Sequence, residues 1–384
     1  MIREKIEQTF SLLEELDLDL WLLFLRESKA MADPSLELVI GSHCTWQSAF
    51  AFTRDRRAIA LVGNLDEAKF RELGLFTEVR SYVAGIRESL RTLFAELDPG
   101  RFALNVSTDD YMSDGLTYGM FQLLARHLEG TAYMERWVSS EKLMAALRGR
   151  KSAAEQARIQ AAIDLAEEIY DQVSSFLRPG RTEKEVAAFI LELVDRAGVS
   201  TAGDRSECTA VFSGPDSAGA HCGPTDRAIE PGHLLNMDFG VKKDGYCSDI
   251  QRTWYVLRPG EERAPEIVQK AFDAIVESIR LGAEACRPGR TGLEVDTLVR
   301  GFITAQGFPE YKHATGHQVG RSTHDGAALL APLWERYGKI PHMLLEPGQV
   351  YTIEPRIPVP GHGVATLEEI VVVTAEGGRW LSRP

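Results

Sequence analysis

The chain has 384 residues, 44% hydrophobic and 26% charged, which is typical of an ordinary folded protein and long enough for two domains. Its formal net charge of −13 disfavours nucleic acid and anionic membrane surfaces as partners. No apolar run approaches the length of a membrane span, and the N-terminal stretch alternates charged and apolar residues instead of showing a signal peptide's apolar core. We therefore expect a cytoplasmic protein without a membrane partner.

The cysteines are odd in number, widely spaced and without a Cys-x-x-Cys pair. This pattern argues against a disulfide framework and against a thiolate zinc site, so we expect reduced thiols. The residues concerned are Cys44, Cys208, Cys222, Cys247 and Cys286.

Residues 1–140 alternate helical and strand patterns, which predicts a small α/β domain. The segment has no glycine-rich phosphate loop and no cluster of histidines or acids at ligand spacing. We expect it to cover or narrow a site built elsewhere, or to dimerise. The predicted elements are a helix to residue 16, strands at 21–25, 49–52 and 58–62, a helix from 66, a strand near 79, a helix at 88–97, a strand at 102–106 and a helix at 116–128.

A second domain, residues 141–384, is predicted to begin with a long amphipathic helical stretch that runs from residue 139 to 177. Within this domain RPGRTEKEV, at 178–186, recurs 109 residues later as RPGRTGLEV, at 287–295. Each copy contains the Thr-x-x-Glu pattern of a helix capping box, and each helix that follows ends at a glycine, Gly198 or Gly307. The second domain is therefore predicted to be an internal duplication.

The first half of the duplication contains a predicted β-hairpin that carries two acids. Residues 236–254 read NMDFGVKKDGYCSDIQRTW, with β-favouring flanks around Asp244-Gly245. A loop of two residues would place Asp238 and Asp249 diagonally, and a loop of four directly opposite; both put them on one face, with Cβ atoms about 5 to 8 Å apart. Carboxylates at that distance repel unless a cation or a proton intervenes. The alternative is an exposed acidic pair on an edge hairpin.

The second half contains two strand-like runs, QVYTIEPRIPV and GVATLEEIVVVT, which carry Glu354 and Glu368. A pseudo-twofold axis would bring this pair towards the two aspartates, and a multivalent metal site is the simplest reason to gather four carboxylates. KHATGHQVGRSTHDG, between the two halves, adds His313, His317 and His324. Four carboxylates and one imidazole would bind two divalent ions, with Mn²⁺ favoured over Co²⁺, Zn²⁺ or Fe²⁺. Such a pair of metals is suited to hydrolysis.

These motifs carry a family resemblance. NMDFG with SDIQRT, GHxxG with a following THD, TIEP and LEE resemble, in order and spacing, the pita-bread metallopeptidases: methionine aminopeptidase, aminopeptidase P and prolidase. The resemblance covers the chain from about residue 145 onward. It implies an α+β fold in which an internally duplicated, pseudo-twofold pita-bread domain follows a smaller creatinase-like α/β domain, the layout of the aminopeptidase P and prolidase branch. It also implies a homodimer.

The resemblance implies a role for each acid. Asp238 should bind one metal ion, and Asp249 and Glu368 should bridge both. His317 and Glu354 should bind the second ion. Glu354 is also the implied general base for the water between the metals.

Three further histidines match family positions. His324, in THD, resembles the histidine that contacts the scissile carbonyl or the oxyanion. His221, in FSGPDSAGAHCGPT, resembles a histidine near the leaving group, and His313 resembles one that shapes the proline pocket. Read singly, each of them is instead a hydrogen-bonded structural residue.

The sequence departs from the family pattern where the substrate end would be held. The family usually has an arginine two positions before the last ligand glutamate, where this chain has Thr366, and it has EPG where this chain has Glu-Pro-Arg ending in Arg356. Arg321 is a further unusual residue, between the second and third histidines of the region. Arginine binds carboxylates as a bidentate fork. The hypothesis is that Arg321 or Arg356 holds the free C-terminus of a short peptide; the alternative is that both are solvated or paired with nearby acids.

The resemblance predicts a dinuclear metal-dependent exopeptidase that hydrolyses short peptides at Xaa-Pro bonds, as an Xaa-Pro aminopeptidase or an Xaa-Pro dipeptidase. Alternatives are an exopeptidase of relaxed or non-proline specificity, a creatinase-like hydrolase of a small non-peptide substrate, and a non-catalytic binding protein. The complete ligand set argues against a creatinase. The presence of His221 and His324 argues against a mere scaffold.

Overall fold

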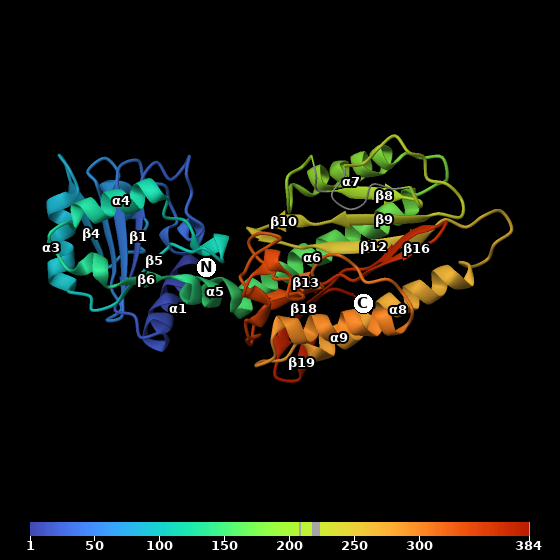
Figure 1. The fold of residues 1–384 in the computed structure, drawn as a ribbon. Helices are drawn as coiled ribbons and strands as arrows, with labels where there is room; N and C mark the ends of the chain where they lie inside the picture. The colour runs from blue at the N-terminus through green and yellow to red at the C-terminus, as the bar shows by residue number, and fades with distance from the viewer. Residues whose placement is uncertain (207–208, 217–222, 384) are drawn as a thin grey trace. The chain divides into compact units, whose positions relative to one another are not determined.

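The structure is a computed structural model that describes residues 1–206, 209–216 and 223–383. It forms two compact units, Met1–Arg148 and Gly149–Pro384 (Figure 1). The expected domain boundary after residue 140 lies at the start of helix α5 (Glu141–Gly149), whereas the units divide at the end of that helix. Within the described ranges, no helix is both long and apolar enough to cross a membrane.

The first unit is built on one mixed six-stranded sheet with the order β4-β3-β2-β1-β5-β6. Strands β1, β2 and β3 pair antiparallel, and β4, β5 and β6 join in parallel. All the predicted helices and strands of this segment are present. They are α1 (Ile2–Glu15), β1 (Leu20–Leu25), β2 (Ser48–Thr53), β3 (Ala58–Gly63), α2 (Glu67–Glu72), β4 (Glu78–Tyr82), α3 (Arg87–Leu97), β5 (Phe102–Leu104) and α4 (Tyr118–His127). The structure adds elements that were not predicted: strand β6 (Trp137–Ser139) and the short helical turns η1 (Leu36–Ile40), η2 (Tyr111–Ser113) and η3 (Tyr133–Glu135).

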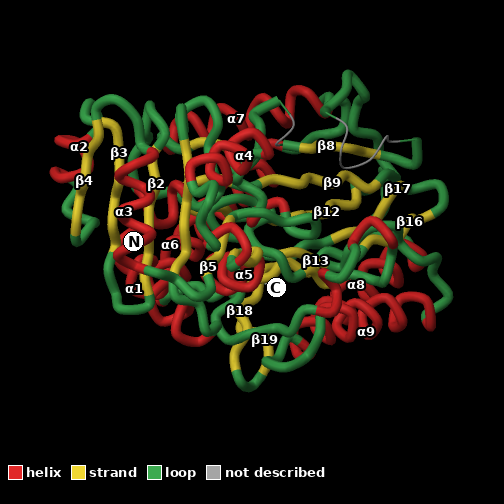
Figure 2. Tube along the Cα trace, turned by 60° about the vertical axis from the view of Figure 1, so that its left-hand side comes forward, coloured by secondary structure: helices red, strands yellow, loops and turns green. Residues whose placement is uncertain are grey.

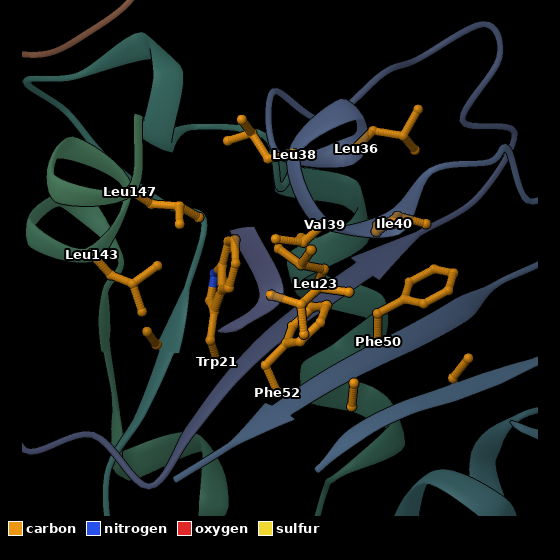
Figure 3. Close-up of a cluster of buried hydrophobic side chains, with 14 of the residues drawn as sticks. Trp21, Leu23, Leu36, Leu38, Val39, Ile40, Phe50, Phe52, Leu143 and Leu147 are labelled. Atoms are coloured by element: carbon orange, nitrogen blue, oxygen red, sulfur yellow. The ribbon is translucent and has the colours of Figure 1, made fainter. Parts of the chain in front are cut away.

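The core of this unit lies on both faces of the sheet. Every residue of strand β1 is buried, and because side chains alternate along a strand, Trp21 and Leu23 face one layer and Leu22 and Phe24 the other. Figure 3 shows Trp21 and Leu23 packed in the first layer with Phe52. The two layers remove apolar side chains from water on both faces of the sheet, which stabilises this unit.

The helical stretch predicted across residues 139–177 is interrupted, because α5 ends at Gly149 and α6 (Ala153–Phe176) starts anew. Ser152 caps the second helix: its Oγ accepts the Glu155 N–H at 3.2 Å, and the Glu155 carboxylate accepts the Ser152 N–H at 2.9 Å. This reciprocal capping box stops the first helix from continuing into the second.

The repeated sequence forms the same local structure twice. Thr182 and Thr291 each accept the backbone N–H of the glutamate three residues later at 3.2 Å, and each glutamate accepts the threonine N–H at 2.7 Å. These two capping boxes start helices α7 (Glu183–Ala197) and α9 (Gly292–Ala305). The internal duplication predicted from the sequence is therefore visible in the backbone.

Most strands of the second unit lie between α7 on one side and α8 (Glu266–Ala285) and α9 on the other (Figures 1 and 2). They form short sheets with the orders β11-β10-β7, β12-β9-β8, β13-β14, β15-β18-β19 and β16-β17. The strands are β7 (Ser200–Thr201), β8 (Ala210–Ser213), β9 (Leu234–Phe239), β10 (Val241–Lys243), β11 (Tyr246–Cys247), β12 (Ile250–Tyr255), β13 (Gly316–His317), β14 (Leu329–Leu330), β15 (Val350–Ile353), β16 (Arg356–Val359), β17 (Gly363–Thr366), β18 (Glu369–Thr374) and β19 (Gly377–Trp380), with 3-10 turns η4 (Glu335–Tyr337) and η5 (Ile340–His342).

Candidate metal centre

The predicted hairpin is present, and its loop has two residues. Lys243 pairs with Tyr246, and the intervening Asp244 and Gly245 have φ angles of 51° and 81°. Positive φ at both positions is the requirement of a type I′ turn, which explains the Asp-Gly sequence. Of the two loop lengths that the sequence allowed, the structure has the shorter one.

This register fixes how the two aspartates are arranged. Gln251 of β12 lies directly opposite Asp238 of β9, so Asp249, two residues earlier, is the diagonal neighbour of Asp238. Residues two apart on a strand share a face, and both acids therefore lie on the same side of the hairpin.

The glutamates sit at the matching end of the second half. Glu354 directly follows β15 and Glu368 directly precedes β18. The ladder ends with Ile353 paired to Glu369, and continuing its register by one residue sets the two glutamates opposite one another. The Glu368 N–H donates to the Gln251 carbonyl oxygen at 3.3 Å, which joins this segment to the hairpin. The two halves thus meet through backbone as well as through side chains.

His317 on β13 points its Nε2 atom at the acids. That nitrogen lies 3.4 Å from a Glu354 oxygen, 3.6 Å from an Asp249 oxygen and 3.9 Å from a Glu368 oxygen. Asp249, His317 and Glu368 can each offer one ligand atom such that the three atoms lie within 4.8 Å of one another. Asp249 and Glu368 lie more than a hundred residues apart in the sequence, so only the tertiary fold brings them together.

Asp238 belongs to the same cluster. Its negative charge contributes to the raised pKa values of Asp249, Glu354 and Glu368. Burial raises the pKa of Asp238 itself to about 7, against the opposing charge of Arg356. The structure therefore gathers all five residues that the sequence predicted as metal ligands.

The electrostatics of the cluster suit a cation. Burial, followed by the repulsion of neighbouring carboxylates, holds the pKa of Asp249, Glu354 and Glu368 well above the ordinary range. Burial and the nearby His324 lower the pKa of His317 to about 3, so its imidazole is neutral. Neutral imidazole and oxygen-rich donors are what a divalent ion of the Mn²⁺ to Zn²⁺ series requires, and such ions would remove the repulsion. The residues present therefore fit a metal site.

A hydrogen bond at Nδ1 of His317 orients its other ring nitrogen, Nε2, towards the acids. Its Nδ1 lies 3.2 Å from the Gln318 carbonyl oxygen, which can only accept a hydrogen bond. Nδ1 therefore carries the hydrogen, and the lone pair of Nε2 faces the carboxylates. This second interaction is the kind that orients metal-binding histidines.

Gln251 is a component of the site that sequence reasoning missed. Its Nε2 donates to Glu354 Oε2 at 3.2 Å, and its Oε1 accepts from Thr366 Oγ1 at 2.9 Å. The side chain thus links the hairpin to the second half. The register signal could have identified it, because a two-residue loop places this residue opposite Asp238.

The additional histidines are placed differently from one another. The His324 ring is exposed and stands edge-on to His317, with 4.3 Å between ring centroids. His313 is half-buried, with Nδ1 2.9 Å from the Ala314 carbonyl oxygen and its ring 5.0 Å from Tyr311. His221 lies outside the described residues.

The two candidate arginines also differ. Arg356 is half-buried; its guanidinium carbon lies 5.1 Å from the Phe212 ring centroid, and its charge acts on Asp238 and Glu354. Arg321 instead packs over Tyr246, 5.3 Å from the ring centroid. Only the first of the two is thus directed at the acid cluster.

Comparisons with known proteins show the family of this chain. The model of metallopeptidase family M24 matches residues 157–375. An uncharacterised peptidase of Bacillus subtilis, YqhT, is 32% identical over 71% of this chain and 72% of its own length. A putative Xaa-Pro aminopeptidase of Mycoplasma pneumoniae is 31% identical over 62% of this chain and 63% of its own length.

The fold agrees over the whole chain. The solved structure of an Xaa-Pro dipeptidase from Bacillus anthracis aligns with a TM-score of 0.76 at 26% identity, covering 100% of this chain and 98% of that one. The expected α+β fold, with a pita-bread domain after a smaller α/β domain, is confirmed. The protein is an enzyme, and the chain belongs to metallopeptidase family M24.

Proposed function

We propose that this metallopeptidase is a dinuclear exopeptidase that hydrolyses short peptides at Xaa-Pro bonds. The observation that carries the proposal is the convergence of three carboxylates, those of Asp249, Glu354 and Glu368, on the neutral imidazole of His317. The charge of Asp238 acts on all three acids. The named activities of similar proteins, an Xaa-Pro dipeptidase and a putative Xaa-Pro aminopeptidase, support the choice of bond.

Each member of the cluster receives a role. Asp238 would hold one cation, His317 and Glu354 the other, and Asp249 and Glu368 both. When bound, two divalent cations, Mn²⁺ first and Co²⁺, Zn²⁺ or Fe²⁺ as alternatives, supply Lewis-acid activation of water and of the scissile carbonyl.

The remaining chemistry belongs to protein side chains. Glu354, whose pKa burial raises, is suited to take a proton from the attacking water and to pass it to the leaving amine. His324 would donate a hydrogen bond to the oxyanion, since it stands at the edge of the cluster. We assign His221 to the leaving group and His313 to the proline pocket on the family resemblance.

We further propose that Arg356 holds the free carboxylate of a dipeptide. In the β16–β17 ladder it lies directly opposite Thr366, the position at which the family usually has its arginine. Opposite residues in an antiparallel pair share a face, with Cβ atoms about 5 Å apart. A guanidinium on either strand can therefore reach the same part of the site. Arg321, packed on Tyr246, is the weaker candidate for this role.

An exchange of these two positions tests the carboxylate role. Arg356→Thr should raise the KM for Ala-Pro by about 10- to 100-fold, the weight of a hydrogen bond to a charged group. Adding Thr366→Arg to that variant should restore much of the loss, whereas Arg321→Ala serves as the control. An unchanged KM in Arg356→Thr would remove the role.

The function itself is tested by metal analysis and a substrate panel. We expect about two equivalents of metal per chain and Mn²⁺-dependent cleavage of Ala-Pro or Ala-Pro-Ala, but not of Met-Ala-Ser or creatine. Cleavage of the tripeptide alone would indicate an aminopeptidase, and cleavage of the dipeptide alone a dipeptidase. Turnover of creatine only, or of nothing, would reject the proposal.

We also propose a cytoplasmic homodimer. Buried free thiols at Cys44 and Cys286 suit a reducing compartment. Light scattering during size-exclusion chromatography would test the dimer.

A further inference from the structure

A buried ion pair supports the loop that carries His324. Lys151 Nζ lies 2.9 Å from Asp325 Oδ2, and the two side chains are 0% and 3% exposed. Lys151 precedes the segment that the family model matches. Asp325 directly follows His324 in the sequence.

The Asp325 carboxylate organises the loop. Its Oδ2 also accepts the Arg321 N–H at 3.0 Å, and its Oδ1 accepts from Ser322 Oγ at 3.3 Å. The same hydroxyl lies within hydrogen-bond distance, 2.9 Å, of the His324 carbonyl oxygen. The backbone on both sides of the exposed histidine is thus tied to one buried carboxylate.

The backbone packs closely around the pair. A Cβ atom on Gly320 would lie 2.1 Å from Asp325 Oδ2 and 2.8 Å from Lys151 Nζ. The Lys151 N–H donates to the Gly348 carbonyl oxygen at 3.1 Å, which anchors the lysine to the turn before β15. Lys151 therefore connects the loop, through its ammonium group, to the turn before β15, through its backbone N–H.

We propose that Lys151 is a positioning residue for His324. A buried carboxylate needs a charged partner, and removing that partner leaves an uncompensated charge that must move towards water. Because Asp325 adjoins His324, such a movement would displace the imidazole from the edge of the cluster. This inference rests on the proposed hydrolytic function of the site.

The test compares Lys151→Met in two backgrounds. Lys151→Met should lower the kcat for the cleaved proline peptide by about 10- to 100-fold, the effect of an ångström-scale misplacement, with less than about a twofold change in KM because substrate binding is untouched. In a His324→Ala background, itself lowered by about 100-fold or more, Lys151→Met should have no further effect. Ile190→Ala, a cavity at a fully buried position of α7, controls for general destabilisation and should leave kcat unchanged below its melting temperature.

Two further variants test the same role and cover the case in which Lys151→Met does not fold. Lys151→Met with Asp325→Asn removes both charges and retains an acceptor oxygen for the Arg321 N–H. Because no uncompensated charge remains, it should regain most of the kcat that Lys151→Met loses. If Lys151→Met does not fold, Asp325→Asn alone should show the loss of kcat, again only when His324 is present; a double variant as impaired as either single variant would contradict the positioning role. Equal losses with and without His324, a loss no larger than in Ile190→Ala, or an unimpaired His324→Ala would overturn the positioning role alone. A wild-type enzyme without peptidase activity would instead overturn the proposed function and this inference with it.

Discussion

The two halves of the second unit begin with the same local structure but differ in how they place their acids at the site. Both begin with a Thr-x-x-Glu capping box, and in each the threonine forms an isolated bridge to a later segment, Thr182 to Ala228 and Thr291 to Leu344. At the site, the first half presents two acids as diagonal neighbours and the second presents them directly opposite one another. The symmetry of the scaffold therefore does not extend to its carboxylates.

The difference has a structural use. Because the first pair is diagonal, the position opposite Asp238 is left to Gln251, whose amide reaches Glu354 and Thr366. If the two aspartates were directly opposite one another, an acid would occupy the position opposite Asp238 and add repulsion to an already negative cluster. The asymmetry replaces a charge by a neutral bridge between the halves.

The largest effect should come from removing an acid that both cations would share. Asp249→Asn and Glu368→Gln should each lose both metals and lower kcat/KM by about 10³-fold or more, since several kcal/mol of Lewis-acid stabilisation disappear. Asp238→Asn should retain one metal. Plasma emission spectrometry and peptide cleavage measure this, with the exposed turn variant Asp244→Asn as control. Equal metal loss in all three ligand variants would contradict the assignment.

Without metal, the protein should become less stable as the pH rises. In the metal-free protein the pKa of Asp238 is about 7, above its ordinary value near 4, so its contribution to stability is complete below about pH 4 and is lost as pH rises through 7. EDTA-treated protein should therefore melt at a lower temperature at pH 8 than at pH 5, and Mn²⁺ should raise the pH 8 value most. Calorimetry with and without metal measures this; a pH slope that Asp238→Asn leaves unchanged would refute the cause given.

Breaking the neutral bridge should have an intermediate effect. Gln251→Leu removes hydrogen bonds to both Glu354 and Thr366 and should weaken metal binding by about 10- to 100-fold, as loss of a partner to a metal ligand does. Thr366→Val removes only one end and should cost less. Competitive chelator titrations compare the two, and a larger effect for the valine variant would contradict the order of the bridge.

The smallest effect should come from removing the helix cap that each half has. Thr182→Ala and Thr291→Ala each remove one helix cap and should destabilise the second unit by about 1 kcal/mol, which lowers its melting temperature by about 2 to 4 °C. The exposed Glu262→Ala is a suitable control. Clearly unequal shifts would show that the capping boxes, too, have diverged.

Much of the fold and the acid cluster could be predicted because their signals are local. Strand alternation around Asp244-Gly245 specifies a hairpin, and the repeated RPGRT motif specifies two capped helices. The capping box at Ser152 is equally local, but the apolar periodicity on both sides of it resembles one continuous helix.

The rest depends on contacts that sequence spacing does not reveal. Gln251 acquires its role from Thr366, which lies 115 residues away. The sequence could not distinguish Arg321 from Arg356 as the residue that binds the substrate carboxylate, because neighbouring residues do not indicate where a long side chain points. Only the packing of one on Tyr246 and of the other beside Asp238 separates them.

The tight turn at Asp244-Gly245 also limits how this enzyme can vary in length. Strand residues alternate between faces, so adding one residue between the two aspartates without a compensating bulge would turn Asp249 away from Asp238. Adding two residues would return it to the same face and set the pair directly opposite. With the turn kept at Asp244-Gly245, insertions in the strand that follows it should therefore be tolerated by parity: two residues keep both acids on one face, and one residue separates them.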